Sequence, residues 1–209
     1  SIHDALLDCL VAEGAHVADA RETELLRAAL WDADGRRTAD TIAISAQAIA
    51  ARAGFGIAPD RRFFLVPQVD IGRHNAFSSE KLSVVVSMFR YSGFDEALRM
   101  VEAIYEVGGK GHSCGIYSFD DDHIDRLART APVSRIMVRQ PQSKANAGAF
   151  DNGMPMTSSL GCGTWGGNIT SENIHLKHYM NVTWVSRPIA EDRPSEEELF
   201  GEFHGTPVD

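Results

Sequence analysis

The sequence has few cysteines, no cluster of basic residues and no long hydrophobic run. Its three cysteines, Cys9, Cys114 and Cys162, are an odd number without Cys-x-x-Cys spacing, which argues against a disulfide framework or a zinc knuckle. The 20 basic residues are outnumbered by 29 acidic ones, for a net charge of -9, so nucleic acid is not an expected partner. No stretch approaches the roughly 20 apolar residues that cross a bilayer, and no secretory signal is recognisable. We therefore expect a cytoplasmic protein that binds neither membrane nor nucleic acid.

What the sequence does contain is the composition and periodicity of a folded α/β protein. Its 209 residues are 44% hydrophobic and 23% charged, as in ordinary globular domains. Helical patterns occupy the first quarter of the chain at about 2–13, 20–31 and 38–53. A glycine follows each of them, namely Gly14, Gly35 and Gly54. Glycine in these positions is typical of helix C-caps.

Strand and helix patterns then alternate along the middle of the chain. Short runs rich in β-branched and aromatic residues predict buried strands at 63–66, 82–89, 114–117 and 135–138. Helices are expected at about 94–107 and 121–131. Alternation of this kind implies right-handed crossovers and a parallel sheet with helices on both faces. We expect at least four strands, preceded by a three-helix segment.

The last third of the chain is less regular. Residues 140–173 lack periodicity and are rich in Gly, Pro, Asn, Ser and Thr, as functional loops often are. Trp165 and the paired glycines favour an ordered backbone there. One isolated strand is expected at 181–186, and Ser195 followed by three glutamates predicts a capped acidic helical turn.

Two glycine-rich segments are candidates for chemistry. Gly108–His112 closes a helix and opens a strand, whereas a dinucleotide loop follows a strand and opens a helix, so a helix C-cap is the better interpretation. In Leu160–Asn168, four glycines flank Cys162 and Thr164. Glycine there would permit close approach of backbone to a ligand. A structural turn and a nucleophilic Cys162 both remain open, although no neighbouring base is evident.

The motifs together resemble one enzyme family. They are Ser79-Glu80-Lys81-Leu82-Ser83, Gly108-Gly109-Lys110-Gly111-His112-Ser113, and Gly161-Cys162-Gly163-Thr164-Trp165-Gly166-Gly167-Asn168 followed by Ser171-Glu172-Asn173. In order and interval they resemble the CoA-acylating aldehyde dehydrogenases, which include acetaldehyde, succinate-semialdehyde and sulfoacetaldehyde dehydrogenases and the first half of bifunctional aldehyde–alcohol dehydrogenases. The resemblance extends from about Ser1 to Trp184.

The resemblance implies that the chain is part of a longer enzyme. In that family a nucleotide-binding domain precedes the catalytic domain, whose first segment carries the nucleophilic cysteine just before a helix like the one expected at 2–13. We therefore expect the nucleophile upstream of Ser1 and absent from this chain. Residues 1–180 would be the catalytic domain, and 181–209 an oligomerisation strand with an acidic tail.

The resemblance also assigns roles to single residues. Glu80 would hold the nicotinamide ribose, with a solvated residue before a strand as the alternative. Leu82 would border the nicotinamide ring. His112 would lie near the thioester, where an imidazole could take the proton of the CoA thiol, and a buried histidine with satisfied hydrogen bonds is the alternative.

The aldehyde pocket is expected along the irregular segment. The residues that would line it are Gln140, Pro141, Thr157, Cys162 and Thr164. Arg139 and Lys144 would be anchors for an anionic head group, or else solvent-facing charges. No metal site is predicted.

The expected function is oxidation of a short, anionic aldehyde such as sulfoacetaldehyde to its acyl-CoA. The cofactor would be NAD or NADP, with coenzyme A as co-substrate and a cysteine thioester as intermediate. The protein would be a homo-oligomer, and this chain alone would be inactive. The alternatives are a noncatalytic oligomerisation or regulatory module, and an enzyme that uses Cys162 as its nucleophile.

Overall fold

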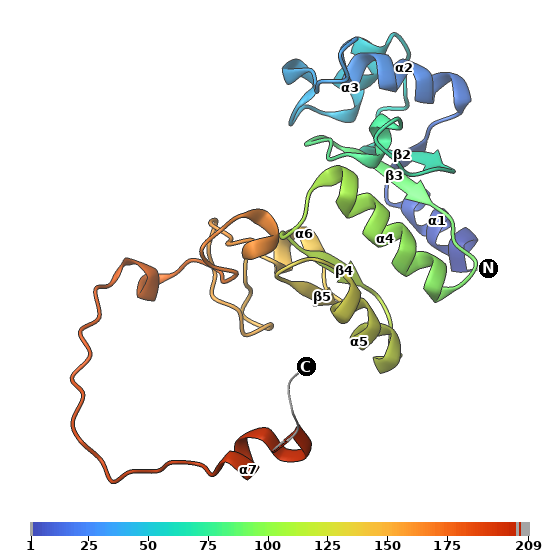
Figure 1. The fold of residues 1–209 in the computed structure, drawn as a ribbon. Coiled ribbons are helices and arrows are strands. Elements are labelled where there is room, and N and C mark those ends of the chain that lie inside the picture. Colours follow the sequence, from blue (N-terminus) through green and yellow to red (C-terminus); the bar gives the residue numbers. More distant parts are fainter. Residues whose placement is uncertain (1, 204, 206–209) are drawn as a thin grey trace. The chain divides into compact units, whose positions relative to one another are not determined.

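A computed structural model describes residues 2–203 and residue 205 (Figure 1). The chain divides into two units, Ser1–His175 and Leu176–Asp209. Every strand found among the described residues belongs to the first unit.

The strands of the first unit form two small parallel sheets. One has the order β1-β2-β3, formed by β1 (Ala15–Val17), β2 (Phe63–Gln68) and β3 (Val85–Phe89). The other pairs β4 (Cys114–Ile116) with β5 (Ile136–Val138). All three strand pairs are parallel, which confirms the parallel α/β fold. The expectation of one sheet with at least four strands is wrong, because the strands of the described residues divide into a three-stranded and a two-stranded sheet.

Helices cover both faces of the first sheet. They are α1 (Ile2–Ala12), α2 (Ala20–Leu30), α3 (Ala46–Ala53) and α4 (Phe94–Gly108). In Figure 1, α2 and α3 lie above the sheet and α1 and α4 below it. The remaining helices of this unit are α5 (Asp121–Thr130) and the short α6 (Gln142–Ala145).

The core lies between α2, α3 and β2. Its fully buried side chains are Leu26, Leu30, Ile49, Phe64 and Val66. Burying a side chain of this size stabilises the fold by roughly 1.5–3 kcal/mol. Trp31 meets Phe77 edge to face, with ring centroids 5.1 Å apart, so the turn before β3 is anchored to the end of α2.

In the first half of the chain, the structure departs from the elements expected from the sequence at three places. The helix expected at 38–53 is a 3-10 turn, Ala39–Thr41, followed by α3 from Ala46. Ala43 has a left-handed φ of 54°, which breaks a helix, and Ser45 Oγ then caps the new one by accepting from Ala48 N at 3.2 Å. Leu82 has a φ of 47°, so the strand expected at 82–89 begins only at Val85. Finally, β1 was not predicted, because three residues are too few to show a period.

The glycine caps are confirmed at two of the helix ends. Gly54 caps α3 with a left-handed φ of 81°, and Gly109 caps α4 with a φ of 96°. Gly35 is not a cap, because α2 ends at Leu30 and Gly35 lies in the following turn, where its N–H donates to Asp32 O.

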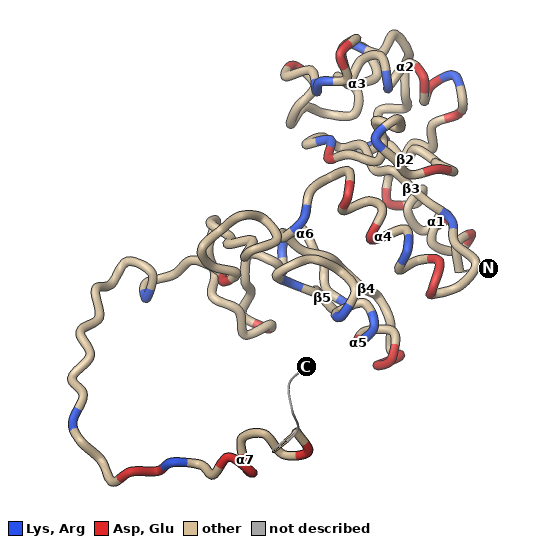
Figure 2. Tube along the Cα trace, in the orientation of Figure 1, with Lys and Arg blue, Asp and Glu red and all other residues tan. Residues whose placement is uncertain are grey.

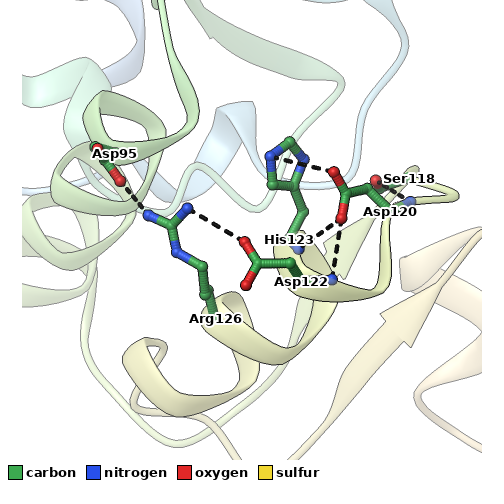
Figure 3. A network of polar contacts seen from close by, with 6 residues as sticks. All are labelled: Asp95, Ser118, Asp120, Asp122, His123 and Arg126. Atoms are coloured by element: carbon green, nitrogen blue, oxygen red, sulfur yellow. Dashed lines mark hydrogen bonds and ion pairs between the residues drawn. The ribbon is translucent and has the colours of Figure 1, made fainter.

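Polar contacts hold α5 to α4 (Figure 3). Asp120 caps α5 by accepting from the N–H groups of Asp122 and His123. Arg126 forms ion pairs with Asp122 and with Asp95 of α4. The hydrogen bond that Arg126 donates to the Asp95 carboxylate is the main cause that raises the pKa of Arg126. The His123 ring also stacks on Phe94 of α4, with centroids 3.9 Å apart.

The second unit contains a 3-10 turn, Leu176–Tyr179, and the helix α7 (Glu196–Phe200). Ser195 and Glu198 form a capping box at the start of α7, which confirms the capped acidic turn. Acidic residues gather before and on this helix (Figure 2). No strand forms at 181–186; the prediction is wrong for the single chain, since a strand requires a hydrogen-bonded partner. None of the helices in the described part of the chain is long and apolar enough to cross a membrane.

Candidate functional site

A cavity of about 760 Å³ in the first unit brings two of the predicted site residues together. Glu80 borders it from the turn before β3, and His112 from the segment between α4 and β4. Its other walls include Val86 and Ser87 of β3 and Tyr105 of α4, together with Gln142 and Asn146 in and after α6. The cavity thus brings together residues that are far apart in the sequence, from the turn before β3 to α6.

The turn that carries Glu80 is fixed from within by Lys81. The ammonium of Lys81 donates to the carbonyls of Phe77 at 2.9 Å and Ser79 at 2.7 Å. Burial, with a further contribution from the nearby Arg37 charge, lowers the pKa of Lys81 to about 8. Glu80, by contrast, is an exposed residue of the cavity lining, and its carboxylate can accept hydrogen bonds from a ligand.

Arg37 holds the same turn from outside. Its Nε and Nη2 both donate to the carbonyl oxygen of Lys81, at 3.0 and 2.7 Å. Its Nη1 donates to Leu30 O and to Thr41 Oγ1. Burial lowers the pKa of this guanidinium. Arg37 therefore ties the end of α2 to the residue that follows Glu80.

His112 is held through its neighbours in the chain. Gly111 before it has a φ of 103°, and a Cβ there would lie 2.5 Å from Cys162 O, so only glycine fits. The His112 carbonyl accepts from Arg135 Nη1 at 3.2 Å. Its ring Nδ1 lies 2.6 Å from Ser113 Oγ.

Ser113 is a polar centre that sequence reasoning missed. The residue is buried, 7% exposed, and its carbonyl accepts from the Tyr105 hydroxyl at 2.8 Å. Its Oγ lies 2.5 Å from Gln142 Nε2 and 3.3 Å from Asn146 Nδ2. Two features of the sequence could have pointed to this polar centre. Ser113 directly follows His112, and Gln142 directly follows the predicted pocket residues Gln140 and Pro141.

The glycine-rich loop packs behind His112 rather than into the cavity. Arg135, 5% exposed, donates to Asn173 Oδ1 at 2.6 Å, to Gly161 O at 2.7 Å and to Ser171 O at 3.2 Å. The ordered backbone expected of this loop is confirmed. The glycines of this loop allow its backbone to approach other parts of the protein closely. A Cβ on Gly161, for example, would lie well inside 3.0 Å of Thr170 O.

The other predicted residues do not line the cavity. Leu82 is 56% exposed. Gln140 accepts from Asn152, Pro141 begins α6, and Thr157 bonds within its own loop. Cys162 and Thr164 lie in the glycine-rich loop, with the Cys162 N–H bonded to Asn168 Oδ1. Arg139 and Lys144 are exposed, and Arg139 donates to Ser118 O and lies over the Phe119 ring.

A carboxylate, an imidazole and two amide side chains around one cavity suit a polar ligand with hydroxyl and carbonyl groups. The carboxylate can accept hydrogen bonds, and the imidazole can donate, accept or transfer a proton.

Known proteins resemble this chain along nearly its whole length. No family model matches it. It is 42% identical over 207 residues to a sulfoacetaldehyde dehydrogenase from an Acholeplasma species, and 35% identical over 207 residues to an acylating sulfoacetaldehyde dehydrogenase from Bilophila wadsworthia. Each alignment covers 97% of this chain, but only 43% and 45% of the relatives.

A solved structure shows the same fold. An acetylating aldehyde dehydrogenase from Geobacillus thermoglucosidasius superimposes with a TM-score of 0.82 at 28% identity, over 91% of this chain and 42% of that protein. The chain thus spans less than half the length of these proteins. By its sequence and its fold, it belongs to the CoA-acylating aldehyde dehydrogenase family.

Proposed function

We propose that this chain is the catalytic-domain portion of an enzyme that oxidises a short anionic aldehyde to its acyl-CoA with NAD or NADP. The observation that carries the proposal is the cavity that Glu80 and His112 share. The reaction requires a nucleophilic cysteine, which we place upstream of Ser1, together with a nucleotide-binding domain.

Glu80 would hold the cofactor. Glu80 is exposed on a turn whose backbone Lys81 and Arg37 both hold, so its carboxylate can bind two vicinal ribose hydroxyls with little loss of backbone freedom. The bound nicotinamide supplies the hydride acceptor. Leu82, two residues after Glu80, stays a proposed neighbour of the nicotinamide ring.

His112 would face the acyl group and the incoming coenzyme A. Its ring lies at the cavity wall, and the main chain on either side is fixed by Gly111 and Arg135. A fixed imidazole can stabilise charge that develops on a reacting oxygen or sulfur. Gln140, Pro141, Thr157, Cys162 and Thr164 remain proposed pocket residues once the complete domain is assembled.

The substrate proposal rests on the relatives, of which the two described above are named for sulfoacetaldehyde. We propose a short aldehyde with a sulfonate or carboxylate group. Arg139 and Lys144 stay candidate anchors for that group, although neither lines the present cavity.

We also propose that the protein is a homo-oligomer, with 1–180 as catalytic domain and 181–209 as an assembly segment with an acidic tail. Residues 1, 204 and 206–209 of these ranges lie outside the described residues. Within 181–186, Val182 is 67% and Trp184 is 91% exposed. An extended apolar segment of this kind gains hydrogen bonds and burial when it pairs with a sheet of a second subunit.

The test begins with the coding sequence upstream of Ser1. The complete reading frame is expressed, and formation of NADH or NADPH is measured with coenzyme A and sulfoacetaldehyde, succinate semialdehyde or acetaldehyde. We expect CoA-dependent oxidation that favours an anionic aldehyde. An E80Q variant should raise KM for the nucleotide about 10-fold or more, since a charged hydrogen bond contributes about 1.5–3 kcal/mol.

Three results would contradict the proposal. Absence of CoA-dependent turnover in the complete protein would favour the noncatalytic module. Turnover by the 209-residue chain that is lost in C162S would favour Cys162 as nucleophile. A clear preference for acetaldehyde would overturn the anionic substrate.

A further inference from the structure

The hydrogen bonds around Ser113 define the protonation of the His112 ring. A serine hydroxyl has one hydrogen to donate and two lone pairs to accept with. The Ser113 Oγ has three neighbours, Gln142 Nε2 at 2.5 Å, Asn146 Nδ2 at 3.3 Å and His112 Nδ1 at 2.6 Å. Both amide groups are donors, so they occupy the two lone pairs.

The single hydroxyl hydrogen is then left for the third neighbour. Ser113 O–H donates to Nδ1 of His112, which therefore accepts. A neutral imidazole carries one hydrogen, and it must reside on the other nitrogen. We propose that Ser113, oriented by Gln142 and Asn146, is a positioning residue that holds His112 as the Nε2–H tautomer.

Two further features make this arrangement rigid. Ser113 is buried and its own carbonyl is fixed by the Tyr105 hydroxyl, so the hydroxyl cannot turn toward water. Asn146 is also buried, and its carbonyl accepts from Asn173 Nδ2 at 3.1 Å, while Asn173 Oδ1 accepts from Arg135. A buried network whose donors and acceptors all match specifies one geometry.

The tautomer determines what His112 offers to a ligand in the cavity. Nε2 makes no hydrogen bond within the described part of the chain and carries a hydrogen, so it is a donor. This reverses the role expected from the sequence, in which the neutral ring accepts the proton of the CoA thiol. This inference rests on the proposed function. The Nε2–H group of His112 donates a hydrogen bond to the carbonyl oxygen of the acyl group, and its proton is not transferred.

The direct test is nuclear magnetic resonance of the ¹⁵N-labelled 209-residue chain. Long-range proton–nitrogen spectra distinguish the two neutral tautomers, and H112Q identifies the signals of His112 by their loss. At a pH where the ring is neutral, we expect the Nε2–H form alone in the wild type. S113A should give a mixture of tautomers, and S113T should restore the single form.

The control and a second variant keep the test decisive. Ser143 lines the same cavity, and S143A should leave the tautomer unchanged. If S113A does not fold, the double variant Q142A/N146A removes both amide donors and should likewise give a mixture. The inference is overturned if His112 carries its hydrogen on Nδ1, or if the single form persists in these variants.

A kinetic arm separates this inference from the proposed function. In the complete enzyme, glutamine at position 112 retains an N–H donor but cannot take up a proton. A donor role predicts that H112Q keeps activity within about 10-fold of wild type, while H112A loses about 100-fold or more. Equal losses in both variants would overturn the donor role. An inactive wild-type enzyme would refute the proposed function and leave the spectroscopic result intact.

Discussion

Arg135, the residue before β5, donates from Nη2 to the carbonyl oxygen of Gly161 at 2.7 Å, across 26 residues of sequence. No ion pair of Arg135 with a carboxylate is present among the described residues; its guanidinium is bound by one amide oxygen and by backbone carbonyls. Burial lowers the pKa of this guanidinium. A buried cation held by carbonyls alone requires its full set of acceptors, so the loop and the arginine depend on each other.

Arg135→Lys should therefore loosen the glycine-rich loop. Lysine keeps the charge but cannot reach Asn173, Gly161 and His112 at once. We expect a loss of roughly 2–4 kcal/mol in the free energy of unfolding, with faster hydrogen exchange at Gly161 and Asn173. Arg129→Lys is the matched control, because the Arg129 side chain is 81% exposed and should change stability by less than about 0.5 kcal/mol. Equal stability of the two variants would contradict the role of Arg135.

Gly161→Ala should destabilise the chain through a steric clash, without any contribution from backbone strain. The φ of Gly161 is not in the left-handed region, but a Cβ would meet the backbone carbonyl of Thr170. Because backbone cannot move aside cheaply, we expect a loss of about 1–3 kcal/mol in thermal or denaturant unfolding. Gly56→Ala has no atom within 4 Å of the new Cβ and should be neutral or slightly stabilising. A harmless Gly161→Ala would disprove this packing.

Lys81 should make stability increase with pH on the alkaline side. Its folded pKa is about 8, below the ordinary value of about 10.4 that it regains on unfolding. Between these values the unfolded chain binds more protons, so the free energy of unfolding contributed by this group rises with pH. The cost to stability of burying the charged Lys81 ammonium is fully present below about pH 8 and disappears above about pH 10.4.

The measurement compares the wild type with Lys81→Met by denaturant unfolding from pH 7 to 10. We expect the wild type to gain stability relative to the variant across this range, on the order of 3 kcal/mol if the whole interval is reached. Lys144→Met controls for removal of an exposed positive charge. A difference between wild type and Lys81→Met that does not change with pH would contradict the prediction.

Deletion of residues 181–209 should abolish assembly of the complete protein. Without the apolar segment around Val182 and Trp184, we expect monomers or aggregates by light scattering. A shorter deletion, 187–209, keeps that segment and should keep the oligomer. A complete protein that is monomeric at micromolar concentration would rule out the proposed assembly role.

The sequence by itself determined the local elements and the class of fold. The alternation after residue 60 predicted β2, α4, α5 and parallel pairing, because burial patterns and caps act within a few residues. The motifs around Glu80 and His112 predicted two residues that do share the cavity. The capping box at Ser195 was likewise readable from four consecutive residues.

Only the tertiary structure decided how these pieces meet. The division of the strands into two sheets depends on which strands pair across long stretches of sequence, and no local pattern encodes that choice. The convergence of Gln142 and Asn146 on Ser113, and of the loop on Arg135, joins residues about 30 positions apart. Residues 181–186 form no strand in this chain, although their sequence favours one, because a strand exists only through hydrogen bonds to another strand. Local propensity sets what each segment can become, and long-range contacts select which polar groups face one another.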